Sequence, residues 1–246
     1  MAQNTSNNPG QINNNKQFEI NAYGKDESWR LFRIIGEFVE GFDKLSGIEP
    51  SVSFYGALHV TPEDKVYNQC VEIARRLGEM GYSIVTGGGP GMMEAANRGA
   101  HEAGAKSIGL NIELPQPQAC NLFVNQPLTF NHFFVRKVML VKYASAFIIM
   151  PGGLGTLDEL TEVLVLMQTR KIKPFPIILF DSNYWEGFLS WLCNTALAKG
   201  LISEDDFNLL RICDTPDQVV ELIQNWSSKH EIAGRKAVCK IAPGQK

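Results

Sequence analysis

The chain has 246 residues and a net charge of −3, and 44% of its residues are hydrophobic and 20% charged. These values are ordinary for a globular protein, and they give no electrostatic reason to expect a nucleic acid or an acidic membrane surface as a partner. The longest apolar runs, such as AFIIM and FPIILF, are far shorter than the roughly 20 residues that a membrane span needs. We therefore expect a globular protein with its own core and neither a membrane nor a nucleic-acid partner.

The five cysteines and four histidines are scattered, without a CxxC pair or the spacing of a metal site. The N-terminus has no basic-then-apolar secretory pattern. We expect no metal, reduced thiols and a cytoplasmic location.

The two ends of the chain differ in composition from its middle. Residues 1–21 are rich in Asn, Gln and Ser, and residues 227–246 carry several lysines and arginines. Neither stretch has enough apolar surface to form a core. We predict a disordered segment over 1–21, a single folded domain over 22–226 and a flexible basic tail over 227–246.

The first half of the folded part begins with an amphipathic helix that contains Trp29 and Phe42. A short strand follows at 51–56, and then a helix that Thr61 would cap and Pro62 would begin. Residues 82–104 read as strand, glycine loop and helix.

The second half continues this alternation, except that residues 115–131, with three prolines, are expected to form an irregular connection. Strands are expected at 107–114, 146–150 and 175–180, and helices at 133–144, 154–171, 184–200 and 215–226. Short, continuously apolar strands that alternate with helices are typical of a parallel sheet covered on both faces. The sequence therefore predicts an α/β fold, a doubly wound (Rossmann-like) parallel sheet with helices on both faces, and leaves the strand order open.

Two glycine loops follow predicted strands directly. The first contains Gly87, Gly88, Gly89 and Gly91 and leads to Met93 and Glu94; the second contains Pro151, Gly152, Gly153, Gly155 and Thr156. Because parallel strands end at one edge of the sheet, both loops should open on the same side. Glycines let a ligand approach the backbone, and the first N–H groups of each following helix can bind an anion. The loops therefore predict a phosphate site, although glycines that only make tight turns remain an alternative.

Two well-known phosphate-binding patterns are missing from these loops. Neither GxxxxGK[ST] nor GxGxxG occurs. Glu113 does lie roughly where a dinucleotide-binding fold keeps its ribose-binding acid. A cofactor-binding function therefore stays open.

Charged residues flank the second loop and the helix before it. Thr156 and Glu159 are three residues apart and share a helix face that borders the loop. Glu159 either compensates the helix dipole or acts on a sugar carbon beside a bound phosphate. Arg136 and Lys137 lie about 100° apart on an apolar helix, so at most one easily faces the cleft; the alternative is a salt bridge at a subunit interface.

Three segments, GGGPGMMEAANRGA, FFVRK and PGGLGTLDE, together closely resemble the LONELY GUY (LOG) family of cytokinin riboside 5′-monophosphate phosphoribohydrolases, which often carry the label lysine decarboxylase. The likeness covers about residues 50–225. It implies hydrolysis of the N-glycosidic bond of a nucleoside 5′-monophosphate, such as AMP, to free base and ribose 5-phosphate, without a cofactor. A decarboxylase would need a Schiff-base lysine for pyridoxal phosphate, and nothing in the sequence singles one out.

The resemblance also implies roles for particular residues. Arg136 and Glu159 would be catalytic, and the glycines of both loops with Thr156 would hold the phosphate and sugar. Met93, Glu94, Lys137 and Pro151 would be further substrate-binding positions, and a homodimer or a higher homo-oligomer would be expected.

Glu94 and the long termini set this chain apart from the shorter plant-like members and make it similar to the extended bacterial branch. The preferred base, adenine or prenylated adenine, therefore stays open. So do three other functions: a non-catalytic nucleotide or cofactor carrier, a dinucleotide-dependent oxidoreductase and an interaction role.

Overall fold

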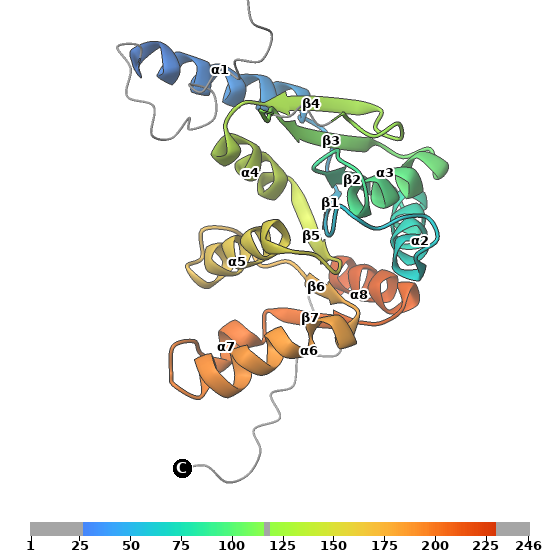
Figure 1. The fold of residues 1–246 in the computed structure, drawn as a ribbon, viewed down its shortest axis with the longest axis vertical. Coiled ribbons are helices and arrows are strands. Elements are labelled where there is room, and N and C mark those ends of the chain that lie inside the picture. Colours follow the sequence, from blue (N-terminus) through green and yellow to red (C-terminus); the bar gives the residue numbers. More distant parts are fainter. Residues whose placement is uncertain (1–26, 116–118, 230–246) are drawn as a thin grey trace, which may run out of the picture.

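The computed structural model describes residues 27–115 and 119–229 (Figure 1). The expected disordered segment 1–21 and residues 230–246 of the expected tail lie outside this part, whereas residues 227–229 belong to the last helix. The elements in chain order are α1 (Glu27–Lys44), β1 (Ser51–Tyr55), α2 (Lys65–Glu79), β2 (Ser83–Thr86), α3 (Met92–Glu102), β3 (Ser107–Ile112), β4 (Gln126–Phe130), α4 (Phe133–Lys142), β5 (Ala144–Ile149), α5 (Leu154–Gln168), β6 (Ile177–Phe180), α6 (Ser182–Trp191), the π-helical η3 (Leu192–Leu197), α7 (Glu204–Phe207), β7 (Leu210–Cys213) and α8 (Pro216–Lys229).

The described strands form one parallel sheet in the order β4-β3-β2-β1-β5-β6-β7. Strands β2, β3 and β4 are added one after another on one side of β1. The chain then returns to the other side of β1, where β5, β6 and β7 follow in order. The direction therefore reverses between β1 and β5, where Tyr55 pairs with Ile149. Such a reversal leaves a crevice at the carboxyl ends of the two strands, where ligands of open α/β sheets bind.

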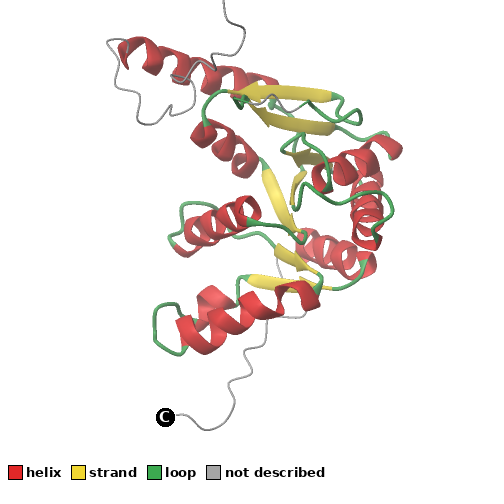
Figure 2. Cartoon of the chain, viewed as in Figure 1, coloured by secondary structure: helices red, strands yellow, loops and turns green. Residues whose placement is uncertain are grey.

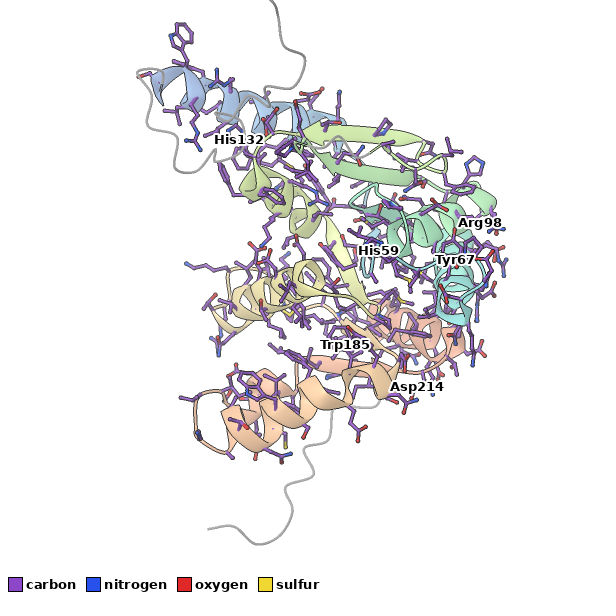
Figure 3. All side chains as sticks on the ribbon, in the orientation of Figure 1. His59, Tyr67, Arg98, His132, Trp185 and Asp214 are labelled. Carbon is purple, nitrogen blue, oxygen red and sulfur yellow. The ribbon has the colours of Figure 1, made fainter. Side chains whose placement is uncertain are left out.

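Helices cover both faces of the sheet, which confirms the predicted doubly wound fold (Figures 1 and 2). On one face α2, α3 and α8 pack against side chains such as Phe54 and Ile148. On the other, α4, α5 and α6 pack against Tyr55 and Phe147, and Trp185 of α6 is almost fully buried there (Figure 3). No helix within residues 27–115 and 119–229 combines the length and apolarity needed to cross a membrane.

The prediction of an irregular connection over 115–131 is wrong in its second half, because β4 lies within it. Pro127 has no N–H to donate, but β4 is an edge strand that pairs with β3 alone, and proline is tolerated there. The other edge strand, β7, and the short helix α7 before it were not predicted. Strand β4 alternates buried and exposed residues, and β7 has only four residues and includes Arg211, so neither strand gives a continuous apolar run.

The predicted start of the second helix is also wrong, since α2 begins at Lys65 rather than at Pro62. The backbone N–H and the hydroxyl of Thr61 both donate to the Asp64 carboxylate, at 2.8 and 3.2 Å. Asp64 thereby closes a turn and takes the cap position itself. The other predicted helices and strands are present within a few residues of their expected bounds.

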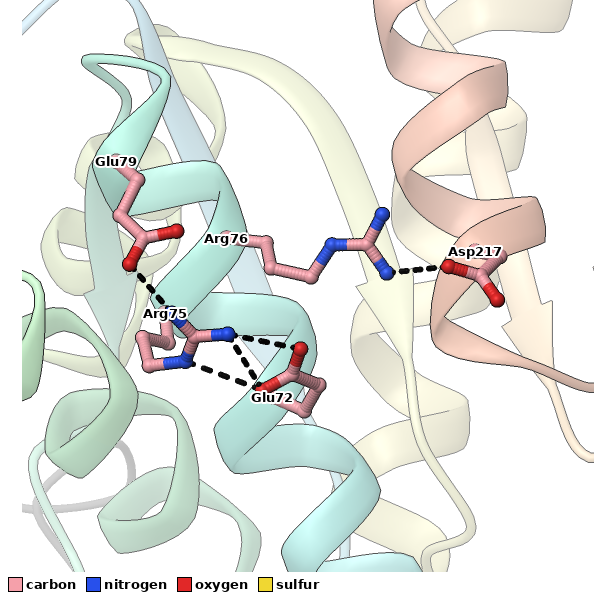
Figure 4. A network of polar contacts seen from close by, with 5 residues as sticks. All are labelled: Glu72, Arg75, Arg76, Glu79 and Asp217. Atoms are coloured by element: carbon pink, nitrogen blue, oxygen red, sulfur yellow. Dashed lines mark hydrogen bonds and ion pairs between the residues drawn. The ribbon is translucent and has the colours of Figure 1, made fainter.

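Ion pairs on the surface of α2 join it to itself and to α8 (Figure 4). Arg75 bridges Glu72 and Glu79 along the helix, and Arg76 reaches Asp217 of α8 at 2.6 Å. These pairs are largely exposed, so each contributes at most about 1 kcal/mol. The buried apolar faces of the helices hold the fold together.

The cysteines differ in state. Cys70, Cys120 and Cys213 carry free thiols, as expected, whereas Cys193 is disulfide-bonded. The expectation of reduced thiols throughout is therefore wrong at Cys193.

Candidate functional site

A cavity of about 400 Å³ lies at the point where the strand order reverses. It collects residues from the segment after β1, the first glycine loop, α4 and the start of α5. Its lining residues are Phe54, Tyr55, Gly56, Ala57, Leu58, His59, Gly87, Met93, Phe133, Arg136, Gly153, Leu154, Gly155, Thr156, Asp158 and Glu159. The cavity thus brings together seven of the expected site residues: Gly87, Met93, Arg136, Gly153, Gly155, Thr156 and Glu159.

The glycines of the second loop do two different things. A Cβ on Gly152 would collide with the Thr156 hydroxyl, so Gly152 serves close packing and does not line the cavity. Gly153 and Gly155 line it, and a Cβ on either would meet no atom within 4 Å. Gly153 is the N-cap of α5, where the first N–H groups of a helix have no intrahelical partner. Open space beside free N–H groups is what an anionic ligand requires.

Neighbouring backbone and side chains fix the second loop in place. The Ala57 N–H donates to the Pro151 carbonyl at 2.8 Å, and the Tyr184 hydroxyl donates to the Gly152 carbonyl at 2.7 Å. Pro151 itself is not among the lining residues. The loop is therefore held from both sides before any ligand arrives.

Most glycines of the first loop meet needs of the backbone. Gly88 and Gly91 have φ values of +74° and +69°, which other residues rarely adopt. The carbonyls of Gly88 and Gly89 accept hydrogen bonds from the Asn121 side chain. Only Gly87 among the four lines the cavity, where a Cβ would collide with the Arg136 guanidinium. At Gly88 and Gly91 the backbone conformation is enough to explain a glycine.

Two asparagines that belong to no recognisable sequence motif hold this first loop. Asn97 of α3 accepts from the Thr86 hydroxyl at 2.6 Å and from Asn121 at 3.0 Å. It also donates to the Ser107 hydroxyl at 2.9 Å. This buried network ties the ends of β2 and β3 to the loop, and so fixes Gly87 beside the cavity.

Glu159 lies in the second turn of α5, is only 8% exposed and lines the cavity. Its Oε2 has no hydrogen-bond partner among the described residues. Burial raises its pKa to about 7, although the positive charges of Lys137 and Arg136 oppose the rise. The carboxyl therefore changes its protonation state close to neutral pH, as a general base or acid does.

Arg136 and Lys137 point to different places, as their spacing predicts. Arg136 lines the cavity, and its Nε donates to the Leu110 carbonyl at 2.6 Å. Burial lowers the pKa of Arg136, while the Glu159 charge acts in the opposite direction. Lys137 is not among the lining residues.

Lys137 joins α4 to α5 instead. Its Nζ forms ion pairs with Asp158 at 2.8 Å and with Glu162 at 2.9 Å. Burial acts to lower its pKa, but these two carboxylates raise it above the usual value. Lys137 thus sets the field around Glu159 from outside the cavity.

Glu94, considered above as a further cleft acid, lies outside the lining. It accepts a hydrogen bond from the Tyr67 hydroxyl at 3.1 Å, and Tyr67 lies with Arg98 on the α2–α3 side of the sheet (Figure 3). Burial and the Glu94 charge raise the pKa of Tyr67 to about 12. Glu94 therefore serves the contact between α2 and α3.

Sequence reasoning missed the end of β1 and the segment after it, which contribute Tyr55 and His59 to the lining. Tyr55 is 7% exposed, and its hydroxyl has no hydrogen-bond partner among the described residues. The position of this segment offered a signal, because every strand of a parallel sheet delivers its last residues to the same edge. Neither tyrosine nor histidine forms part of a recognisable motif there.

A family model described as "Possible lysine decarboxylase" matches residues 93–223. The "Cytokinin riboside 5'-monophosphate phosphoribohydrolase LOG" of Oryza sativa subsp. japonica is 29% identical over 164 residues, which cover 66% of this chain and 67% of that protein. A protein of Arabidopsis thaliana with the same activity in its name is 27% identical over 174 residues, 70% of this chain and 80% of that one.

Solved structures are similar in fold alone. A molybdenum cofactor binding protein from Rippkaea orientalis superposes with a TM-score of 0.53 at 22% identity, over 72% of this chain and 96% of that one. The molybdenum cofactor carrier protein of Chlamydomonas reinhardtii superposes with a TM-score of 0.53 at 18% identity, over 73% of this chain and 99% of that one.

The family match spans more than half of the chain and includes both Arg136 and the second glycine loop. This chain belongs to the family described as possible lysine decarboxylase, which confirms the LONELY GUY resemblance of its motifs.

Proposed function

We propose that this protein hydrolyses the N-glycosidic bond of nucleoside 5′-monophosphates, AMP or a cytokinin riboside monophosphate, and releases the free base and ribose 5-phosphate. One observation carries the proposal: the buried Glu159 carboxyl and the open backbone at Gly153 and Gly155 line the same cavity. The names of the relatives give the same reaction for those proteins. The reaction uses a site that binds the phosphate of the nucleotide and a carboxylate beside the sugar.

The phosphate would bind at the start of α5. The free N–H groups of the first turn would donate to its oxygens, and the Thr156 hydroxyl, which lines the cavity, would add another donor. Each charge-assisted hydrogen bond contributes about 1.5–3 kcal/mol, whereas the helix dipole alone contributes about 0.3–1 kcal/mol. Several such bonds would hold the non-reacting end of the substrate, and that binding energy orients the reacting end.

Glu159 would act on the sugar. As the bond between C1′ and the base nitrogen breaks, its electrons go to the base and positive charge develops on the ribose, as in glycoside hydrolysis. An ionised carboxylate stabilises that charge and takes a proton from the water whose oxygen bonds to C1′. Arg136 would stabilise the negative charge on the departing base or clamp the sugar.

Decarboxylation is a poorer fit to the cavity, in spite of the description of the family. Pyridoxal phosphate needs a lysine for its Schiff base. No lysine stands among the lining residues that the structure describes, and Lys137 is ion-paired with Asp158 and Glu162. Hydrolysis uses the groups that do line it.

The decisive experiment is incubation with a panel of nucleoside 5′-monophosphates, followed by chromatography for free base and an assay for ribose 5-phosphate. We expect release of base from AMP or from its N6-prenylated form. Tight binding without release would contradict the proposal and favour a non-catalytic carrier. Binding of NAD(H) with hydride transfer would favour an oxidoreductase instead.

We further propose that the protein works as a cytoplasmic homodimer built from one domain per chain. The location is supported by the free thiols of Cys70, Cys120 and Cys213. The dimer is supported by an exposed apolar stripe on α1, formed by Trp29, Phe32, Ile35, Val39 and Phe42. A stripe of this kind marks a contact surface.

A further inference from the structure

Tyr55 is the last residue of β1, and its side chain lies on the face that α4 covers. On that face the Ser51 hydroxyl donates to the Tyr143 carbonyl at 2.6 Å, and the Ser53 hydroxyl donates to the Leu140 carbonyl at 2.8 Å. Two strand residues rise about 6.6 Å, which is little more than one helical turn. Tyr55 is the next residue on this face, so it lies about one turn closer to the start of α4.

This position brings the phenol into the cavity that Arg136 and Glu159 also line. The ring packs on Phe147 of β5, with ring centroids 5.1 Å apart. Burial raises the pKa of Tyr55 well above its usual value; the charge of Glu159 raises it further, while the charge of Arg136 and the nearby Ser53 hydroxyl lower it. The Ser53 hydroxyl gives its own proton to the Leu140 carbonyl. The hydroxyl therefore lies within electrostatic reach of both groups and remains protonated at any working pH.

Two buried oxygens in this region have no hydrogen-bond partner among the described residues, the Tyr55 hydroxyl and Glu159 Oε2. A buried polar atom without a partner is destabilising, and a phenylalanine at position 55 would pack on Phe147 without that penalty. The two atoms are chemically complementary, because a phenol donates one hydrogen bond and an ionised carboxylate only accepts.

We propose that Tyr55 is a positioning residue for Glu159, whose O–H donates to the free carboxylate oxygen, directly or through one water, and so keeps the carboxylate ionised and aimed at the sugar. The effect of Tyr55 on turnover rests on the proposed function, whereas its hydrogen bond to Glu159 does not. The remaining charged groups around this carboxyl are Arg136 and Lys137 on α4 and Asp158 and Glu162 on α5. Tyr55 is the neutral donor that approaches from the sheet.

The test compares Tyr55→Phe with Tyr82→Phe. Tyr82 is equally buried but belongs to the core on the opposite face of the sheet. Tyr82→Phe therefore removes one buried hydroxyl, as Tyr55→Phe does, but away from Glu159. Carbon-13 NMR of carboxyl-labelled glutamate follows the titration in each full-length variant, and Glu159→Gln identifies the Glu159 signal by its loss. Thermal unfolding confirms that both phenylalanine variants fold, as their retained rings should allow.

We expect the titration midpoint of Glu159 to rise by about one pH unit in Tyr55→Phe, because the ionised form loses a donor. In Tyr82→Phe it should stay where it is. An unchanged midpoint in Tyr55→Phe would overturn the proposal, whether or not the protein cleaves nucleotides.

Kinetics provide the second arm. In the pH profile of kcat, the acidic limb should move to higher pH by the same amount in Tyr55→Phe. KM should stay nearly unchanged because the phosphate loop is intact. A uniform loss of kcat at every pH, without movement of the limb, would contradict a role through Glu159. If the wild type releases no base, the proposed function fails while the NMR arm still decides the contact.

Discussion

At the scale of single residues, Glu159 combines burial, a free oxygen and a pKa near 7, and each of these properties can be tested separately. The variant Glu159→Gln keeps the shape of the side chain and removes its charge. We expect kcat for AMP to fall by two to four orders of magnitude, the usual contribution of general base catalysis. Binding of AMP, measured by calorimetry, should persist, because the phosphate loop is untouched.

The matched control is Glu186→Gln, an exposed position on α6. It should leave kcat unchanged. Near wild-type turnover in Glu159→Gln would remove this residue from the mechanism.

The same substitution should alter stability in a pH-dependent way. Burial raises the pKa of Glu159 from 4.5 to about 7, so between these values the folded chain binds a proton that the unfolded chain has released. The stability that this proton contributes is fully present below about pH 4.5 and is lost as the pH rises through 7. The neutral glutamine avoids the loss. We expect Glu159→Gln to be more stable than the wild type by about 3 kcal/mol at pH 8 in urea denaturation, with the gain largely gone near pH 5.

At the scale of elements, the second glycine loop separates two roles that look alike in the sequence. Gly152→Ala should be destabilised by about 1–3 kcal/mol, because its Cβ would collide with the Thr156 hydroxyl. Gly153→Ala should fold normally, since its φ of −88° suits alanine and the space beside it is open. Its methyl group would enter the cavity, and we expect KM for AMP to rise about tenfold or more, a change of about 1.4 kcal/mol. Equal effects of the two variants on KM would contradict this division.

Composition and periodicity were enough to predict most helices, the buried central strands and the side of the sheet on which the glycine loops open. They could not identify the edge strand β4, which alternates buried and exposed residues, or the edge strand β7, whose four residues include Arg211. They also missed the start of α2, where Asp64 rather than Thr61 takes the cap. The site was predictable as far as motifs reached, to Arg136, Glu159 and the second loop. Tyr55 lies in no motif and enters the cavity because β1 and β5 flank the reversal of strand order. That order depends on long-range packing, which alternation along the chain does not encode.

At the scale of the whole molecule, the cavity is assembled from both halves of the sheet. The segment after β1 and the first loop come from one half, and α5 comes from the other. Neither half alone therefore holds a phosphate loop opposite the residues that would enclose the sugar. The reversal of strand order is the feature that turns two ordinary strand-to-helix turns into one site.

At this scale α1 lies at the β4 end of the sheet (Figure 1), and among the described residues it carries an exposed apolar stripe. Trp29, Phe32, Ile35, Val39 and Phe42 are each at least 40% exposed and follow one another at intervals of three or four residues. That spacing places them on one face of the helix, which another helix can cover. The opposite side of α1 is already occupied, since Glu37 is bonded to His132 at 3.0 Å. The exposed stripe is therefore available to a second copy of the chain.

We expect light scattering to give twice the 27.4 kDa mass of one chain. Phe32→Glu should shift the protein toward monomers without lowering its melting temperature, because the side chain is 64% exposed and a charge there harms only the contact between copies. Leu201→Glu, equally apolar and 73% exposed but far along the chain on the loop before α7, is the control and should leave the mass unchanged. A monomeric wild type, or a Phe32→Glu protein that remains dimeric, would show that this stripe does not join two copies.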